Sequence, residues 1–188
     1  KPYPCGVINH AYIESAIKLK ERHPFRPEDV EKVLCRIHPD AAQTGCEPVE
    51  SKLRPESGYH AKFSLQYCVA CALVDGDVTI RSFTDEKVRD PRILALAEKV
   101  EHEPDPDSPY PATYPGWLII RLRDGTVLED RQPFNKGSRE NPMTEAEIAR
   151  KYMNNALMKI SEEQAAFIRD QIFNIQNIAN ILDLTRCF

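Results

Sequence analysis

The spacing between hydrophobic residues changes twice along the first part of the chain. Between His10 and Arg22 apolar residues recur every three to four positions, which predicts a helix, and Asn9 precedes it as a candidate N-cap. From Glu31 to His38 the period is two, which predicts a strand with Val33, Cys35 and Ile37 on one face. Residues 39–58 show no period and contain several prolines, so we expect a long loop there.

The middle of the chain alternates between helical and extended segments. Residues 60–75 are rich in small and apolar side chains and precede Gly76, which predicts a helix with a left-handed cap. Residues 77–83 fit a short strand or an extended link. Asp90 followed by Pro91 predicts a helix through Lys99, and an extended segment follows at residues 100–104. Residues 104–116 are proline-rich and predicted to be irregular.

The last third contains a hairpin and then two helices. Asp124-Gly125 lies between two alternating runs, which predicts strands at residues 117–122 and 126–132. Capping-box pairs at Thr144/Glu147 and Ser161/Gln164 open predicted helices over 145–159 and 162–180. The second helix is expected to carry a stripe of isoleucines, at positions 168, 172, 175, 178 and 181.

Together these elements predict an α+β fold in two layers. An antiparallel sheet of about four strands is covered by helices mainly on one face, and a C-terminal helical hairpin follows. We expect residues 1–140 to form the α+β domain and residues 141–188 to form helices whose apolar stripe needs a partner.

Composition narrows the function classes. The chain has 188 residues and a formal net charge of -4, which gives no overall attraction to nucleic acid or to an acidic membrane. Six cysteines are too few for a disulfide scaffold, and the longest apolar runs are too short to cross a bilayer. No signal peptide is visible, so we expect a cytoplasmic location. The chain starts at Lys1 without an initiator Met, which we interpret as a processed, split or truncated chain.

Two cation-rich segments are the best candidates for binding chemistry. The first places Lys52, Arg54, His60 and Lys62 before a predicted helix, whose N-terminus favours anions. The second is Lys1-Pro2-Tyr3-Pro4-Cys5, followed by His10. Either segment is also compatible with an ordinary charged surface. Cys68 and Cys71 form a C-x-x-C pair inside an apolar helix, which favours core packing over redox chemistry. No metal-binding or nucleotide-cofactor motif is present.

Three stretches together resemble the MmgE/PrpD family, which includes 2-methylcitrate dehydratase and cis-aconitate decarboxylase. The first is KPYPC at residues 1–5 with the downstream His10. The second is AKFSLQYCVACALVDG at residues 61–76, continuing through FTDEKVRDPR at 83–92. The third is KGSRENPMT at residues 136–144. Their order and intervals agree with the family over nearly the whole chain.

The resemblance implies a set of site residues. His10 and Tyr67 match positions with catalytic roles, and Lys1 matches a position that pairs with a substrate carboxylate. Further candidates for substrate binding are Tyr3, Lys62 and Ser64. These residues are expected to line one side of a cleft, and an N-terminal all-helical domain lines the other. The resemblance implies no metal and no organic cofactor.

By the same resemblance, the chain is the carboxyl-terminal part of a hydro-lyase that dehydrates 2-methylcitrate-like or related di- and tricarboxylic acids. Such an enzyme belongs to propionate metabolism and is expected to be a homodimer. The chain alone is expected to be inactive, because the helical domain carries much of the acid-base machinery. Two alternatives stay open: a family member that catalyses decarboxylation or epimerisation, and a non-catalytic binding or assembly module of the same fold.

Overall fold

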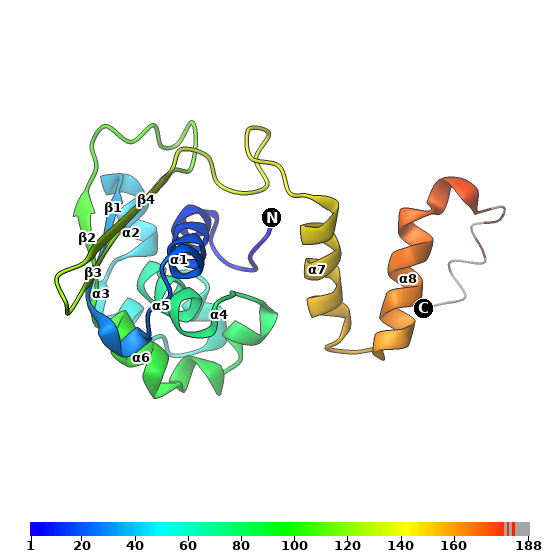
Figure 1. The fold of residues 1–188 in the computed structure, drawn as a ribbon, viewed down its shortest axis with the longest axis horizontal. Helices are drawn as coiled ribbons and strands as arrows, with labels where there is room; N and C mark the ends of the chain where they lie inside the picture. The colour runs from blue at the N-terminus through cyan, green and yellow to red at the C-terminus, as the bar shows by residue number, and fades with distance from the viewer. Residues whose placement is uncertain (179, 181, 183–188) are drawn as a thin grey trace. The chain divides into compact units, whose positions relative to one another are not determined.

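The computed structural model describes residues 1–178, 180 and 182, which form two compact units (Figure 1). The first unit comprises Lys1 and Tyr3–Pro142, and the second comprises Pro2 and Met143–Phe188. None of the helices in the described part of the chain is long and apolar enough to cross a membrane.

A four-stranded sheet forms one layer of the first unit, in the order β2-β1-β3-β4. Its strands are β1 (Val30–Ile37), β2 (Val100–Pro104), β3 (Gly116–Leu122) and β4 (Val127–Gln132). β1 pairs antiparallel with β3, and β3 with β4, whereas β2 runs parallel to β1. The α+β class and the four strands are therefore confirmed, but the sheet is mixed. The helical crossover between β1 and β2 allows their parallel pairing.

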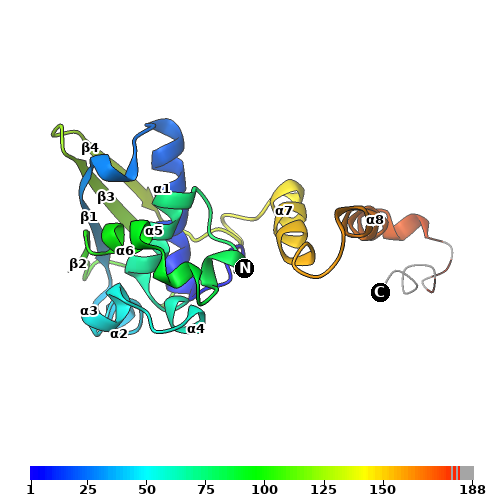
Figure 2. The same cartoon turned by 90° about the horizontal axis from the view of Figure 1, so that it is seen from below.

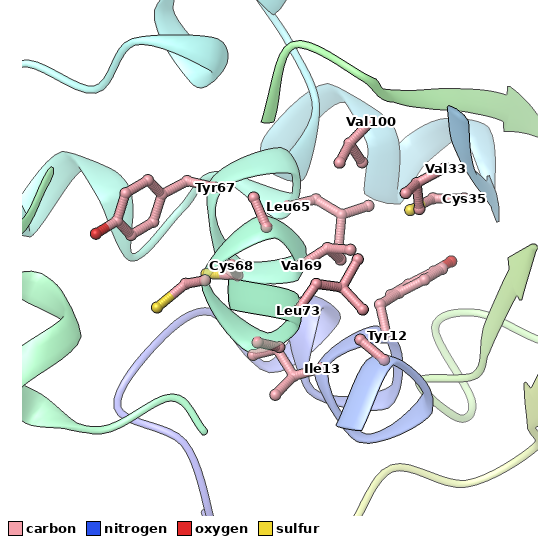
Figure 3. Close-up of a cluster of buried hydrophobic side chains, with 14 of the residues drawn as sticks. Tyr12, Ile13, Val33, Cys35, Leu65, Tyr67, Cys68, Val69, Leu73 and Val100 are labelled. Carbon is pink, nitrogen blue, oxygen red and sulfur yellow. The ribbon is translucent and has the colours of Figure 1, made fainter. Parts of the chain in front are cut away.

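Helices cover one face of this sheet, as predicted (Figures 1 and 2). The covering helices are α1 (His10–Arg22), α5 (Leu65–Asp75) and α6 (Pro91–Ala97). Val33, Cys35 and Ile37 are buried on the face toward the helices, which confirms the alternation read from the sequence. Side chains of α1 and α5 meet this face in a continuous apolar core (Figure 3).

Two segments differ from the predictions. The expected loop at residues 39–58 contains two short helices, α2 (Pro39–Gly45) and α3 (Val49–Leu53), which are too short to show an apolar period. The expected helix over residues 60–75 is interrupted: α4 (Gly58–Ala61) ends before Ser64, which has an extended backbone and caps α5 through its hydroxyl. Gly76 is left-handed at φ 79°, as predicted.

Two of the predicted turn and cap positions are confirmed in the connections. Asp90 caps α6 by accepting a hydrogen bond from the Arg92 N–H, and Gly125 occupies the left-handed position of the β3–β4 turn at φ 88°. Residues 77–83 do not form a strand. The described 3-10 segments are η1 (Val7–Asn9), η2 (Pro27–Asp29), η3 (Ile80–Phe83), η4 (Lys87–Arg89) and η5 (Ile175–Asn177).

The second unit contains α7 (Glu145–Ala156) and α8 (Glu162–Phe173). Thr144 and Glu147 form the predicted capping box, and the Ser161 hydroxyl accepts from the Gln164 N–H. The predicted end of the second helix at Asn180 is wrong, because α8 ends at Phe173 and η5 follows. The isoleucines therefore do not share one helix, and the last, Ile181, lies outside the described residues.

Gly58 offers a test of this packing. A Cβ atom at residue 58 would lie 1.8 Å from the carbonyl oxygen of Phe83, so Gly58→Ala forces backbone to move. We expect the free energy of unfolding to fall by about 1–3 kcal/mol in urea denaturation. Gly6→Ala is the control, because its nearest contact would be 3.4 Å away. Equal stability of the two variants would contradict this account of the α4–η3 contact.

Candidate functional site

The segment that precedes α1 is joined to the turn that precedes α5. The Lys62 carbonyl oxygen accepts hydrogen bonds from the Gly6 N–H at 2.8 Å and from Asn9 Nδ2 at 3.2 Å. Asn9 occupies the N-cap position of α1, but its side chain makes no capping bond and instead contacts Lys62 and the Cys68 sulfur, at 3.4 Å. The two stretches singled out by the sequence, residues 1–10 and 61–68, are therefore in contact and form one candidate site.

His10 lies at the centre of this site. Its side chain is fully buried at the start of α1 and packs edge-to-face against Tyr3, with ring centroids 5.4 Å apart and an interplanar angle of 86°. Neither ring nitrogen forms a hydrogen bond of ordinary geometry with a described residue, although the imidazole is close enough to Cys5 to lower the pKa of that thiol, and the Asn9 side-chain oxygen also has no partner among the described residues. Buried polar atoms without partners are costly, so they mark a place where hydrogen-bonding capacity is kept for another purpose.

Cys5 has unusual electrostatics in this cluster. A hydrogen bond from the Cys68 thiol lowers the pKa of Cys5 to about 6, against the opposing effect of burial, and the nearby His10 and Lys1 act in the same direction as the hydrogen bond. Cys68 itself is fully buried, and burial raises its pKa well above the ordinary value. The two thiols therefore differ: the pKa of Cys5 is lowered and that of Cys68 is raised, so Cys5 loses its proton first.

Lys1 and Lys62 supply the cations of the site. Lys1 is exposed, and its charge is close enough to contribute to the lowered pKa of Cys5. Lys62 is half-buried, with its ammonium nitrogen 5.8 Å from the Tyr59 ring centroid and 6.0 Å from that of Phe83. At these distances the aromatic faces attract the ammonium and hold it near the two rings.

The other cations of the predicted cluster are used elsewhere. The Lys52 ammonium is buried and donates to the carbonyl oxygens of Thr44 and Phe63, at 2.7 and 2.8 Å. Arg54 pairs with Glu98 at 2.6 Å. Lys52 and Arg54 therefore hold the loop in place, and Lys62 joins the segment next to His10 through its backbone carbonyl.

Ser64 and Tyr67 have structural partners. The Ser64 hydroxyl donates to the Lys52 carbonyl at 2.6 Å and accepts from the Tyr67 N–H at 3.0 Å. The Tyr67 hydroxyl donates to the Ser82 carbonyl at 2.7 Å, and burial raises its pKa above the ordinary value. Figure 3 shows the Tyr67 ring directed away from Val69 and Leu73 on α5. Their assignment to the substrate site stays a prediction.

The other cysteines that the structure describes belong to the core. Burial raises the pKa of Cys71 to about 12, and its side chain is fully enclosed next to Asp75. Cys68 and Cys71 thus pack in α5, in line with the core interpretation of the C-x-x-C pair. No group of three or more metal-ligating side chains occurs among the residues that the structure describes.

Sequence reasoning missed two members of the site, Cys5 and Asn9. Cys5 stood inside a recognised motif, but no spacing rule connects it with Cys68, 63 positions away. Asn9 was assigned to a helix cap because its residue type favours that role. The contact with Lys62 depends on how α1 packs against α5, which local sequence does not specify.

Comparison with known proteins identifies the family of this chain. The profile of the MmgE/PrpD C-terminal domain matches residues 3–174, so the chain belongs to the MmgE/PrpD family. Cis-aconitate decarboxylase from Mus musculus is 25% identical over 99% of the chain, and the 2-methylcitrate dehydratase-like protein oryR from Aspergillus oryzae is 27% identical over 85%. Mitochondrial 2-methylcitrate dehydratase from Yarrowia lipolytica is 41% identical over 35% of the chain. The chain spans 38% of the length of the mouse protein and 34% of oryR.

The influence of Cys68 on the pKa of Cys5 is open to direct measurement. Cys68→Ala should raise the Cys5 pKa from about 6 toward its ordinary value of 9.0, as followed by the ultraviolet absorbance of the thiolate against pH. Because folding lowers this pKa, the thiolate stabilises the folded state fully above about pH 9, and this contribution is lost as the pH falls to about 6. The Cys68→Ala variant should show a weaker rise in stability across this range.

Cys71→Ala is the matched control, since it removes a thiol from the same helix without touching Cys5. Its titration should keep the step near pH 6. A wild-type protein without such a step, or an identical step in Cys68→Ala, would show that Cys68 does not set the Cys5 pKa.

Proposed function

We propose that this chain forms one wall of the active site of a lyase that acts on a small di- or tricarboxylic acid. The preferred reaction is dehydration of a 2-methylcitrate-like acid. The observation that carries the proposal is His10, an imidazole buried beside Tyr3 and close to Cys5, whose ring nitrogens form no hydrogen bond of ordinary geometry with the described residues. Family membership supports the same reading, because the named relatives include a dehydratase and a decarboxylase.

The chemistry of such a reaction matches these side chains. Loss of a proton next to a carboxylate builds negative charge on the substrate, and cations fixed in advance around that charge stabilise the transition state. In this proposal Lys1 and Lys62 bind carboxylates, while His10 orients or polarises the acid. Tyr3 fixes the imidazole plane through its ring contact. Each role belongs to a side chain rather than to a bound cofactor.

The proposal includes a second wall. An N-terminal all-helical domain would supply the remaining acid-base groups, and closure of the two domains would exclude water from the substrate. The short span of this chain relative to its curated relatives is consistent with such a domain. We further propose that the complete enzyme is a cytoplasmic homodimer.

Decarboxylation is the second candidate reaction. The relative named cis-aconitate decarboxylase aligns with 99% of the chain, whereas the dehydratase-like relative aligns with 85% at similar identity. Both reactions pass through carbanion-like species next to a carboxylate, so the same residues serve either. Assaying both 2-methylcitrate and cis-aconitate, and identifying the products, separates the two candidates.

Substitutions of Lys1 and His10 test the proposal in protein that contains the helical domain. Lys1→Ala should lower kcat/KM about 10- to 100-fold, mainly through KM, because a charge-assisted contact with a carboxylate is lost. His10→Gln should lower kcat about 100-fold or more. Steady-state kinetics give both values, and thermal melting verifies that the variants are folded.

His23→Gln is the control for His10→Gln, because His23 is an exposed histidine just beyond the end of α1. Its activity should equal that of the wild type. Tyr67→Phe tests whether the Tyr67 hydroxyl is structural or catalytic. A lower melting temperature with unchanged kcat would show that the hydroxyl acts only through its hydrogen bond to the Ser82 carbonyl. Wild-type rates in both Lys1→Ala and His10→Gln would refute the site and favour the binding-module alternative.

The second unit offers an independent test of the partner domain. Several apolar side chains on its helices are exposed, including Phe167 at 50% and Ile172 at 46%. In the isolated chain no helical domain covers these side chains. Contact between two copies of the chain would remove this apolar surface from water. We therefore expect the isolated chain to self-associate. Ile172→Lys should shift the sedimentation velocity profile toward monomer.

Val127→Lys serves as the control, because Val127 is equally exposed, at 54%, but lies in the first unit. It should leave the profile unchanged, and adding the helical domain should stop self-association through this surface of the second unit. A wild-type monomer, or equal effects of the two lysine variants, would count against this surface as an interface.

A further inference from the structure

The face of the sheet opposite α1 and α5 carries a row of side chains that the proposed function does not use. Arg36 on β1 lies directly across from Trp117 on β3, which in turn lies across from Arg131 on β4. Each guanidinium carbon is 4.6 Å from the Trp117 ring centroid. The indole is therefore flanked by two arginines, one from each neighbouring strand.

The guanidinium N–H groups of both arginines have no hydrogen-bond acceptor among the described residues. Within the described residues neither forms an ion pair or a side-chain hydrogen bond, and Arg36 Nε is buried without any partner. The nearby carboxylate of Glu129 is engaged elsewhere, since it accepts from Trp117 Nε1 at 2.7 Å. A guanidinium stacked on an indole is held in a fixed plane and presents a fork of donors that matches carboxylate or phosphate oxygens.

A pocket adjoins this row at the end of the sheet. It has a volume of about 250 Å³ and is lined by Arg36, Trp117, Arg131 and Asp105, together with a rim of prolines. The volume is below the range of about 300–1,000 Å³ that is usual for drug-sized ligands, so the occupant is small. Asp105 is only 8% exposed, and two arginines against one aspartate leave an excess of one positive charge.

We propose that this pocket binds a small metabolite through one carboxylate or phosphate group held by Arg36 and Arg131. The ligand is a small oxyanion, and Asp105 accepts a hydrogen bond from a hydroxyl or amino group of the same molecule. The site is distinct from the cluster around His10, because Arg36 alternates with Cys35 and Ile37, which face the helices. It does not depend on the proposed lyase activity.

Trp117 is the single tryptophan of the chain, so its fluorescence reports on this pocket alone. The full chain is titrated with citrate and, separately, with inorganic phosphate at constant ionic strength. A saturable change in fluorescence is expected with one of them, and the one that saturates identifies the ligand as a carboxylate or a phosphate. The indole N–H resonance of Trp117 gives a second readout of the same event.

Variants decide whether the arginines are responsible. Arg36→Gln and Arg131→Gln should weaken binding about tenfold or more, and Arg36→Lys should also weaken it, because the charge remains but the planar fork is lost. Arg121→Gln is the matched control: it removes the same charge from β3 outside the pocket and should leave binding unchanged. Lys1→Ala should also bind normally, which separates this site from the one around His10.

The proposal is overturned if neither anion changes the fluorescence or the indole resonance in a saturable way. It is equally overturned if Arg121→Gln weakens binding as much as Arg36→Gln does, because that result would indicate a general charge effect. Circular dichroism of each variant establishes that the sheet is intact when the titrations are compared.

Discussion

The carbonyl oxygen of Lys62 accepts two hydrogen bonds from the segment that leads into α1, one from the Gly6 backbone and one from the Asn9 side chain. These bonds hold the beginning of α1 against the turn that begins α5, two segments more than fifty residues apart in sequence. The packing of both helices on the sheet fixes their direction, and the Lys62 contacts fix their register. His10, Cys5 and Cys68 are neighbours only because this connection exists.

Burial gives the cluster its chemical character. Cys5, His10 and Cys68 are almost completely removed from water, so the charges among them interact in a medium that screens them weakly. The Cys68 thiol, His10 and Lys1 lower the pKa of Cys5, whereas burial, followed by the interaction with Cys5, raises that of Cys68. The His10 nitrogens form no hydrogen bond of ordinary geometry with the described residues. The first unit therefore contains buried polar atoms that form no ordinary hydrogen bond with the described residues, a feature typical of functional sites rather than of hydrophobic cores.

The sheet separates two environments. Its covered face carries the apolar alternation of β1 and packs on α1 and α5. Its other face carries charged and aromatic side chains, with the Arg36–Trp117–Arg131 row across three strands. Period-two geometry makes this separation possible, because adjacent residues of one strand point to opposite faces. A single strand therefore contributes both to the core and to the pocket described for Arg36.

The sequence by itself determined the period of the first helix and the first strand, the left-handed Gly76, the hairpin at Asp124-Gly125, the four strands and the family motifs. These features depend on local backbone preferences and on the spacing of apolar residues, which a sequence displays directly. Only the tertiary structure decided that β2 runs parallel to β1, that Lys52 and Arg54 are used to hold the loop, and that Asn9 bonds Lys62 instead of capping α1. Each of these outcomes depends on contacts between distant segments. A side chain's residue type states which bonds it is able to make, and packing alone selects which of them it makes.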